Sequence, residues 1–487
     1  MKIRKDGLGW RAVAVRGLAA GGLLTASLPP FGWWILGLAG AALLADTLVR
    51  LDGMRMRLLA GATAGLTLYA VGWFWMSEFS VPGYMLAVLI EVAILAGASM
   101  TVARGRLWAV PAALVLAEYV RDHFPFGGVP LAGLPLGQVG GPLAPAARLG
   151  GQLLVVALIG AVAVLVVAGL QRRFVYAVVA LGLVLAAVVG GHLAGGTYRT
   201  GTMNVASVQG GGRRGLRAIY GDPAQVFLAQ LRASTKVDQP VDLVVWPEDV
   251  IDVDQVKGSP QSDAVGRVAQ RLNATVVAGI VEDAGLDHFA NAALAWNPDG
   301  TIAARYDKVH RVPYGEYIPF RGLVKHLANL DAVPRDALAG HGDSVLSTAA
   351  GRLGVAISYE VFFSDRARIA VRHGAEIMLV PTNASSFSTG QVPAQELAAA
   401  RLRAMETGRW VVQAAPTGYS GIVDPGGTVL AHSDLGKQDI IQRRIERRAG
   451  QTPATRLGDG APALAALVAA VAALALPSRR HRQKLSD

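Results

Sequence analysis

The sequence contains no cysteine among its 487 residues, and charged residues are scarce. The absence of thiols excludes disulfide bonds, thiolate metal sites and a thiol nucleophile. Charged residues make up 17% and hydrophobic residues 52%, with a mean hydropathy of +0.38, which is too apolar for an ordinary soluble protein. The net charge of +11 does not indicate nucleic acid, because lysine and arginine form no basic stripe with interleaved aromatic residues. The composition predicts a membrane protein with room for a globular domain.

Eight apolar stretches have roughly the length of a membrane-spanning helix. They cover residues 11–29, 31–49, 57–77, 84–103, 107–120, 151–170, 174–195 and 461–476. The first stretch does not resemble a removable signal peptide, because Leu28-Pro29-Pro30-Phe31-Gly32 leads directly into the second one. We therefore expect about eight spans, with the first one retained in the membrane.

Basic residues precede the first apolar stretch and follow every second one after it. They are Lys2, Arg4, Lys5, Arg50, Arg55, Arg57, Arg104, Arg106, Arg172, Arg173, Arg479, Arg480, Arg482 and Lys484. By the positive-inside rule these loops are cytoplasmic, which places both termini in the cytoplasm. Residues 199–455 then lie on the outer face. The loop 121–150, rich in glycine and proline, lies on the same face as an interfacial or re-entrant segment.

The region 199–448 has a different pattern, in which short apolar runs alternate with helix-like segments. Strands are predicted at 203–208, 241–246, 274–281, 290–296, 353–359, 376–381 and 410–415, and helices at 223–236, 262–272, 365–373 and 392–407. Continuously apolar strands indicate a sheet covered on both faces, and the alternation indicates an α/β layered domain. Tight turns at Pro298-Asp299-Gly300 and Asp424-Pro425-Gly426-Gly427 predict hairpins, so the sheet is expected to be mixed.

Two ionisable residues follow strand-like runs in this region. Glu248 follows Val245-Trp246-Pro247, where the proline ends the run and presents the carboxylate at the sheet end, the usual place for α/β active sites. A glutamate partly removed from water there has the character of a general base. Lys308 lies in Tyr306-Asp307-Lys308-Val309-His310, before a segment dense in aromatic residues and proline. Each residue taken alone also fits an ordinary loop position.

Ser358 ends a third apolar run, Leu353–Ile357, and is followed by Tyr359, Glu360 and a predicted helix. A turn from strand to helix exposes the side chain between them and directs the amide groups of the helix N-terminus at the site. Serine needs a base to become nucleophilic, and Glu248 and Glu360 are the candidates within these motifs. A lysine near such a nucleophile can donate hydrogen bonds to an oxyanion, a contribution of about 3–4 kcal/mol.

Taken together, the Glu248, Lys308 and Ser358 motifs resemble, in order and separation, the nitrilase superfamily, whose sites use Glu, Lys and Cys. With membrane stretches before and after the domain, the chain resembles the apolipoprotein N-acyltransferases over nearly its whole length. The resemblance also rests on Leu28-Pro29-Pro30-Phe31-Gly32-Trp33-Trp34, Glu118-Tyr119-Val120-Arg121, Gly133-Leu134-Pro135, Val208-Gln209-Gly210, Pro381-Thr382-Asn383 and Ala399-Ala400-Arg401-Leu402-Arg403-Ala404-Met405-Glu406-Thr407-Gly408-Arg409.

The resemblance implies a fold, a reaction and a set of roles. It implies a membrane domain over 1–198, an extracytoplasmic αββα sandwich over 199–448, and a linker, last span and basic tail over 449–487. In the implied reaction, a nucleophile takes an acyl chain from a membrane phospholipid. The α-amino group of an S-diacylglyceryl cysteine at a lipoprotein N-terminus then accepts this chain. No metal or diffusible cofactor is implied, and the expected location is the bacterial cytoplasmic membrane.

The implied roles are carried over residue by residue. Glu248 is the general base, Lys308 the oxyanion stabiliser and Ser358 the acyl carrier, with Glu316, Tyr359 and Glu360 supporting the site.

The sequence departs from the family at the nucleophile, where Ser358 stands in place of cysteine. A hydroxyl is a much weaker acid than a thiol, and it gives an oxygen ester that an amine attacks more slowly than a thioester. Three accounts of the serine are open: a natural and active nucleophile, an engineered replacement, or a relative that binds phospholipid or lipoprotein without efficient turnover.

Two further classes of function remain as alternatives. An amidase acting on small soluble amides would share the catalytic motifs but would not need the membrane stretches. A transporter would use Glu91 and Glu118, because ionisable residues inside spans often mark transport paths. The large region 199–448 with its ordered motifs has no role in a transporter, which disfavours that alternative.

Overall fold

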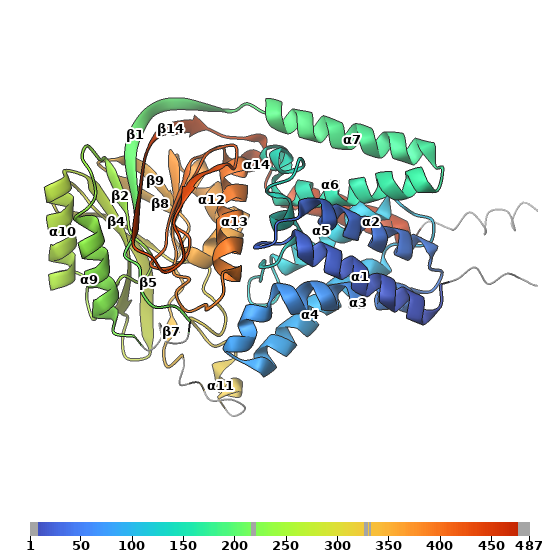
Figure 1. Cartoon of the computed structure of the whole chain (residues 1–487), viewed down its shortest axis with the longest axis horizontal. Helices are drawn as coiled ribbons and strands as arrows, with labels where there is room; N and C mark the ends of the chain where they lie inside the picture. Colours follow the sequence, from blue (N-terminus) through green and yellow to red (C-terminus); the bar gives the residue numbers. More distant parts are fainter. Residues whose placement is uncertain (1–7, 216–220, 326–329, 331–332, 476–487) are drawn as a thin grey trace, which may run out of the picture. The chain divides into compact units, whose positions relative to one another are not determined.

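The computed structural model describes residues 8–215, 221–325, 330 and 333–475 (Figure 1). The chain divides into two compact units, one of Met1–Leu193 with Leu457–Asp487 and the other of Ala194–Arg456. The basic residues predicted to orient the two ends of the chain lie outside the described residues. They are Lys2, Arg4, Lys5, Arg479, Arg480, Arg482 and Lys484.

The first unit is helical, and each predicted apolar stretch contains a helix. The helices are α1 (Trp10–Ser27), α2 (Trp34–Arg50), α3 (Met54–Gly72), α4 (Val81–Met100), α5 (Ala109–Arg121), α6 (Ala147–Leu170), α7 (Phe174–Leu193) and α15 (Gly460–Ala475). Within the described residues, three helical segments are long and apolar enough to cross a membrane: α4, Ala144–Leu170 and α7. These helices fit a membrane domain, whereas the count of eight spans and their orientation remain predictions.

Small residues allow the first helices to approach each other closely. A Cβ atom on Gly17 of α1 would lie 2.8 Å from the carbonyl oxygen of Ala60 in α3, and one on Gly21 would lie 2.1 Å from that of Ala64. Only glycine leaves room for this contact, and small residues at helix interfaces are typical of membrane proteins. The glycines therefore hold α1 against α3 by backbone proximity.

The buried carboxylates of the first unit are paired with one arginine. Arg121 at the end of α5 donates to Glu91 of α4, and its Nη1 lies 3.0 Å from Glu118 Oε2. The same guanidinium donates to the carbonyl oxygen of Leu131 and lies over the ring of Tyr69. Arg121 is fully buried, so its charge offsets those of the two glutamates. This pairing gives Glu91 and Glu118 a structural role in place of the transport role considered above.

The loop 121–150 packs within the first unit. It contains the 3-10 helices η2 (Leu134–Gln138) and η3 (Ala144–Ala146), and η2 contacts α1, α2 and α6. Residues 131–139 are buried. Arg121 anchors this loop through the carbonyl oxygen of Leu131.

The second unit contains two sheets of mixed strand direction. Their strands are β1 (Thr197–Gln209), β2 (Leu243–Val245), β3 (Ile251–Val253), β4 (Thr275–Asp283), β5 (His288–Trp296), β6 (Ile302–Asp307), β7 (Asp336–Ala337), β8 (Val345–Thr348), β9 (Gly351–Val355), β10 (Ile377–Pro381), β11 (Val411–Ala414), β12 (Gly421–Val423), β13 (Val429–His432) and β14 (Asp439–Gly450). The first sheet has the order β14-β1-β2-β4-β5-β6, with β3 beside β4 and β7 beside β5, and the second has the order β13-β12-β11-β10-β9-β8. The predicted hairpins β5–β6 and β12–β13 are confirmed.

Helices cover the outer faces of the two sheets, which gives four layers (Figure 1). The helices α9 (Pro223–Ser234) and α10 (Pro260–Leu272) pack on the first sheet, and α12 (Ser364–Arg372) and α13 (Gln391–Thr407) on the second. An apolar core that includes Val245, Val277, Val355 and Leu379 fills the space between the sheets. The predicted αββα sandwich is therefore confirmed.

The predicted linker at 449–460 is wrong at its start. Ala449 and Gly450 belong to β14, where they pair with Tyr198 and Thr197 of β1, and Pro453–Leu457 form the short helix α14. Sequence reasoning missed β14 because its four arginines, one aspartate and one glutamate are typical of a solvated segment. These side chains are tolerated because an antiparallel edge strand can expose one face to water.

Gly279 lies where β4 passes closest to Glu248, and we expect Gly279→Ala to destabilise the protein. A Cβ atom there would lie 2.4 Å from Glu248 Cα and 2.7 Å from the carbonyl oxygen of Pro247. Overpacking of this kind costs about 1–3 kcal/mol and would shift Glu248. Thermal unfolding in detergent measures the effect. The matched control is Gly201→Ala in β1, where the nearest contact would be Arg447 Cδ at 3.9 Å; equal unfolding temperatures for both variants would contradict the prediction.

Candidate active site

The predicted site residues follow the ends of strands from both sheets. Glu248 follows β2 and Lys308 follows β6 in the first sheet, whereas Ser358 follows β9 in the second. Thr382 follows β10, the neighbour of β9. Backbone hydrogen bonds continue beyond these strands: the Lys308 N–H donates to the carbonyl oxygen of Asn291, and the Thr382 N–H donates to that of Ala414. The regular ladder therefore fixes where each side chain leaves the sheet.

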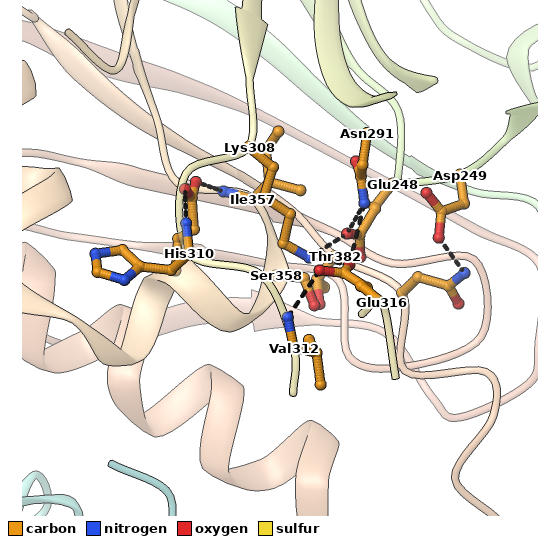
Figure 2. Close-up of polar contacts among 12 residues, drawn as sticks. Glu248, Asp249, Asn291, Lys308, His310, Val312, Glu316, Ile357, Ser358 and Thr382 are labelled. Carbon is orange, nitrogen blue, oxygen red and sulfur yellow. Dashed lines mark hydrogen bonds and ion pairs between the residues drawn. The ribbon is translucent and has the colours of Figure 1, made fainter. Parts of the chain in front are cut away.

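Lys308 lies between two carboxylates (Figure 2). Its Nζ atom donates to Glu248 Oε1 at 2.8 Å and to Glu316 Oε1 at 2.6 Å. Only 1% of the Lys308 side chain and 3% of the Glu248 side chain are exposed, so the ion pair is shielded from water. Burial alone would lower the pKa of Lys308, but the charges of Glu248 and Glu316 outweigh it, and the pKa lies above its ordinary value. Lys308 is therefore a charged hydrogen-bond donor at neutral pH.

Asn291 on β5 joins the same two carboxylates. Its Nδ2 atom donates to Glu248 Oε1 at 2.9 Å and to Glu316 Oε1 at 3.2 Å. Glu316 is held from the other side, because its Oε2 atom accepts a hydrogen bond from the Val312 N–H at 2.8 Å. Glu316 thus contacts the lysine directly. Asn291 was missed, although a single amide within an apolar strand-like run was a usable signal.

Ser358 begins the 3-10 helix η4 (Ser358–Phe362) in an unusual backbone conformation. Its φ angle is +47°, a left-handed value that is uncommon for residues other than glycine. The strand β9 ends at Val355, so the strand predicted at 353–359 is too long at its end, and residues 356–357 lead into a sharp turn. Strained backbone of this kind persists where the surroundings enforce it and often marks functional sites.

Glu360 is not available as the base for Ser358, contrary to one reading of the sequence. Its fully buried carboxylate accepts hydrogen bonds from the N–H groups of Ile357 at 2.8 Å, Val309 at 2.7 Å and His310 at 3.1 Å. Burial raises the pKa of Glu360, and the backbone donors oppose this rise. The carboxylate ties the segment after Lys308 to the turn that carries Ser358, so it positions both.

Tyr359 packs its ring into an aromatic cluster. The ring lies 6.3 Å from that of Phe362 and 5.1 Å from that of Phe363, and the Tyr359 residue is 7% exposed. His310 stacks on Phe363 with ring centroids 4.0 Å apart. These ring contacts pack against the η4 turn, so Tyr359 can support the turn by packing.

Glu396 of α13 also lies at the site, and the sequence analysis did not identify it. Its Oε1 atom accepts hydrogen bonds from Thr382 Oγ1 at 2.7 Å and from Ser358 Oγ at 3.3 Å. Burial raises the pKa of Glu396 to about 7, the charge of Glu248 adds to this effect, and the two hydroxyl donors and Lys308 oppose it. The helix itself was predicted, but no motif distinguishes Glu396 from the other polar residues of α13.

The described residues contain no group of three or more histidine, aspartate or glutamate side chains that could hold a metal ion. The arrangement instead offers a buried hydroxyl, a charged donor and two carboxylates. A hydroxyl beside a carboxylate can attack a carbonyl carbon, and an ammonium can stabilise the oxyanion that forms. The geometry is therefore suited to acyl transfer through a covalent intermediate.

The four-layered fold, with the Glu248–Lys308 pair and Ser358 at strand ends, is typical of the carbon-nitrogen hydrolases. The family model described as Carbon-nitrogen hydrolase matches residues 204–454, and the one described as Apolipoprotein N-acyltransferase N-terminal domain matches residues 20–165. The chain belongs to the apolipoprotein N-acyltransferase family within that class.

Relatives in two bacteria match nearly the whole chain. It is 30% identical to the apolipoprotein N-acyltransferase of Pseudomonas aeruginosa over 90% of each chain. It is also 30% identical to that of Mycolicibacterium smegmatis, over 92% of this chain and 82% of the relative. Among solved structures, Nit3 of Saccharomyces cerevisiae, a nitrilase-superfamily member, is 22% identical, with a TM-score of 0.39, and covers 51% of this chain and 91% of its own.

The raised pKa of Glu396 predicts that Glu396→Gln stabilises the protein at pH 8 but not at pH 4. The unfolded chain loses this proton near the ordinary value of 4.5, whereas the folded chain keeps it until about pH 7. Between these values the native state holds the extra proton, so stability falls as the pH rises. Glutamine removes this penalty, on the order of 3 kcal/mol at pH 8. Thermal unfolding in detergent at both pH values measures it, and an equal shift at both would contradict the assignment.

Proposed function

We propose that this protein transfers an acyl chain from a membrane phospholipid to the α-amino group of an S-diacylglyceryl cysteine at a lipoprotein N-terminus. The observation that carries this proposal is the match to apolipoprotein N-acyltransferases over 90% of the chain, which includes both compact units. The site supports it, because a buried hydroxyl with a charged lysine nearby is suited to acyl transfer and shielded from water. Exclusion of water matters, because hydrolysis would otherwise compete with transfer to the amine.

The first half of the reaction forms an acyl-enzyme. Ser358 Oγ attacks the ester carbonyl carbon of the phospholipid, and its proton passes to a carboxylate base. Lys308 donates a hydrogen bond to the oxyanion of the tetrahedral intermediate, a contribution of about 3–4 kcal/mol for a well-placed donor. The bond to the glycerol oxygen then breaks, this oxygen takes up a proton, and lysophospholipid leaves the acylated Ser358.

The second half transfers the acyl chain to the lipoprotein. The α-amino nitrogen attacks the carbonyl carbon of the acyl-serine, and Glu248 accepts one of its protons as general base. The bond to Ser358 Oγ breaks, the hydroxyl regains a proton, and an amide is formed. Glu316, Tyr359 and Glu360 hold Lys308 and the η4 turn in place through the contacts described above.

The membrane arrangement completes the proposal. Residues 1–193 form the membrane domain, 194–456 the catalytic domain, and 457–487 carry the last span and a basic cytoplasmic tail. About eight spans place the catalytic domain on the extracytoplasmic face of the bacterial cytoplasmic membrane. The support for this orientation is the recurrence of basic residues in every second loop of the sequence.

The test of the reaction is conversion of a diacylated lipopeptide to its triacylated form. We expect the unchanged protein in mixed micelles with phospholipid to give triacylated product by mass spectrometry, and Ser358→Ala to give none. Ser358→Cys is expected to transfer faster, because a thioester reacts with amines more readily than an oxygen ester. Product from Ser358→Cys alone would mean that the serine form binds its substrates without efficient turnover. Product from no form would contradict the proposed reaction.

The role of Glu248 is tested by Glu248→Gln, which keeps an oxygen atom available to Lys308. We expect transfer to fall by at least about 100-fold, because general-base catalysis contributes on the order of 100-fold to 10,000-fold. The matched control is Glu446→Gln, which neutralises a carboxylate on β14 outside the site. Membrane insertion and thermal unfolding are measured in parallel, and full activity of a folded Glu248→Gln protein would contradict the assignment.

A further inference from the structure

Glu396 is the carboxylate that contacts the nucleophile. Its Oε1 atom accepts the hydrogen bond from Ser358 Oγ at 3.3 Å, and Thr382 Oγ1 donates to the same oxygen at 2.7 Å. Within the described residues, the other oxygen, Oε2, is buried and has no hydrogen-bond partner. The residue is 3% exposed and lies in the first turns of α13. One oxygen therefore faces Ser358 Oγ, and the other can accept a further hydrogen bond or a proton.

A structural role does not explain a carboxylate at this position. Its described partners are two hydroxyl groups, which both donate hydrogen bonds to Oε1. The amide oxygen of a glutamine could accept the same two hydrogen bonds. A buried carboxylate without a cationic partner is costly, and the nearby charge of Glu248 adds to the cost. Groups that destabilise a fold in this way are commonly retained for chemistry.

The other carboxylates of the site are already bound elsewhere. Glu248 accepts hydrogen bonds from Lys308 and Asn291, and Glu360 accepts hydrogen bonds from three backbone N–H groups. Among the described residues, no hydrogen bond joins either of them to Ser358. Serine, unlike cysteine, is a weak acid that needs an adjacent base before it attacks. Glu396 is in hydrogen-bond contact with the atom that must lose its proton.

We infer that Glu396 is a catalytic residue that accepts the hydroxyl proton of Ser358 during acylation and passes it to the leaving glycerol oxygen. This inference rests on the proposed function for its substrate, but the activation of Ser358 is a separate claim. As Oγ bonds to the carbonyl carbon, the O–H bond breaks and the proton moves to Glu396 Oε1. When the ester bond to glycerol breaks, that proton passes to the departing alkoxide. In the second half, a proton from the attacking amine reaches Ser358 Oγ as the acyl bond to it breaks.

The activation of Ser358 can be measured without phospholipid by using an alkyl fluorophosphonate. Ser358 Oγ attacks phosphorus, fluoride leaves, and the hydroxyl proton passes to the base, so the labelling rate reports the nucleophile directly. We expect Glu396→Gln to slow the labelling by at least about 100-fold. Glu446→Gln should label like the unchanged protein, and Ser358→Ala should not label at all. In the unchanged protein the rate should rise through pH 7 as Glu396 ionises beside Glu248 and Lys308.

A thiol in place of the hydroxyl separates chemistry from folding. In the Ser358→Cys protein, iodoacetamide alkylation is expected to change by less than about 10-fold on adding Glu396→Gln, because a thiol ionises near neutral pH without a dedicated base. This result would also show that the Glu396→Gln site is intact. Equal losses for the serine and cysteine forms would show a merely structural role and overturn the inference.

Failure of this inference is distinguishable from failure of the proposed function. Labelling that depends on Glu396, in a protein that makes no triacylated lipopeptide, would uphold the base and reject the substrate. Triacylated product together with equal labelling of the unchanged and Glu396→Gln proteins would reject the base and uphold the substrate. An unchanged protein that does not label at all would also overturn the inference, because Ser358 would then not be activated.

Discussion

The buried ammonium of Lys308 is the interaction on which the rest of the active site depends. It lies between Glu248 and Glu316 with 1% of its side chain exposed. Removing one partner from a buried ion pair commonly costs about 3–5 kcal/mol, because the remaining charge has no compensation. The strand ends that carry these groups are therefore held together by charge as well as by the sheet. A cation fixed in this way is also a donor that needs no reorganisation when an oxyanion forms.

Glu360 links this ion pair to the turn that carries Ser358. Lys308 and its partner Glu248 extend from the first sheet, whereas Ser358 follows a strand of the second sheet. The carboxylate of Glu360 connects the two sheets. It accepts hydrogen bonds from the N–H groups of Val309 and His310 after β6 and from that of Ile357 after β9. The three backbone donors are satisfied only if the two segments keep their spacing. The strained φ angle of Ser358 is thus enforced from both sides of the sandwich.

Local sequence pattern was enough to predict the strand ends and three of the residues there. The strands before Glu248 and Ser358 are buried where they approach the site, and such burial is visible as continuous hydrophobicity. The strand before Lys308, β6, lies at the end of its sheet and buries only Tyr306, so it is less apolar. Glu396 could not be found in this way. Its contact with Ser358 depends on which face of α13 packs against the second sheet. The pattern of polar residues in that helix does not indicate this face.

Contacts between segments that lie far apart in the chain could not be predicted from the sequence either. Glu91 could not be interpreted alone, because its partner Arg121 lies on another helix and nothing local links the two. The edge strand β14 was hidden for a related reason. Its charged residues match those of a solvated loop, and only its antiparallel ladder with β1 makes it a strand. In each case the deciding contact is tertiary, whereas the pattern available in the sequence is local.

The serine and the raised pKa of Glu396 are consistent with each other. A thiol can ionise beside a lysine without a dedicated acceptor, but a hydroxyl cannot, so an oxygen nucleophile needs a base in direct contact. That base must also release the proton when the bond to the glycerol oxygen breaks, because the departing alkoxide takes it up. A carboxylate at its ordinary pKa would hold the proton too weakly to do both at neutral pH. Burial, which raises the pKa of Glu396 to about 7, brings its proton affinity close to the value at which accepting the proton and releasing it are balanced.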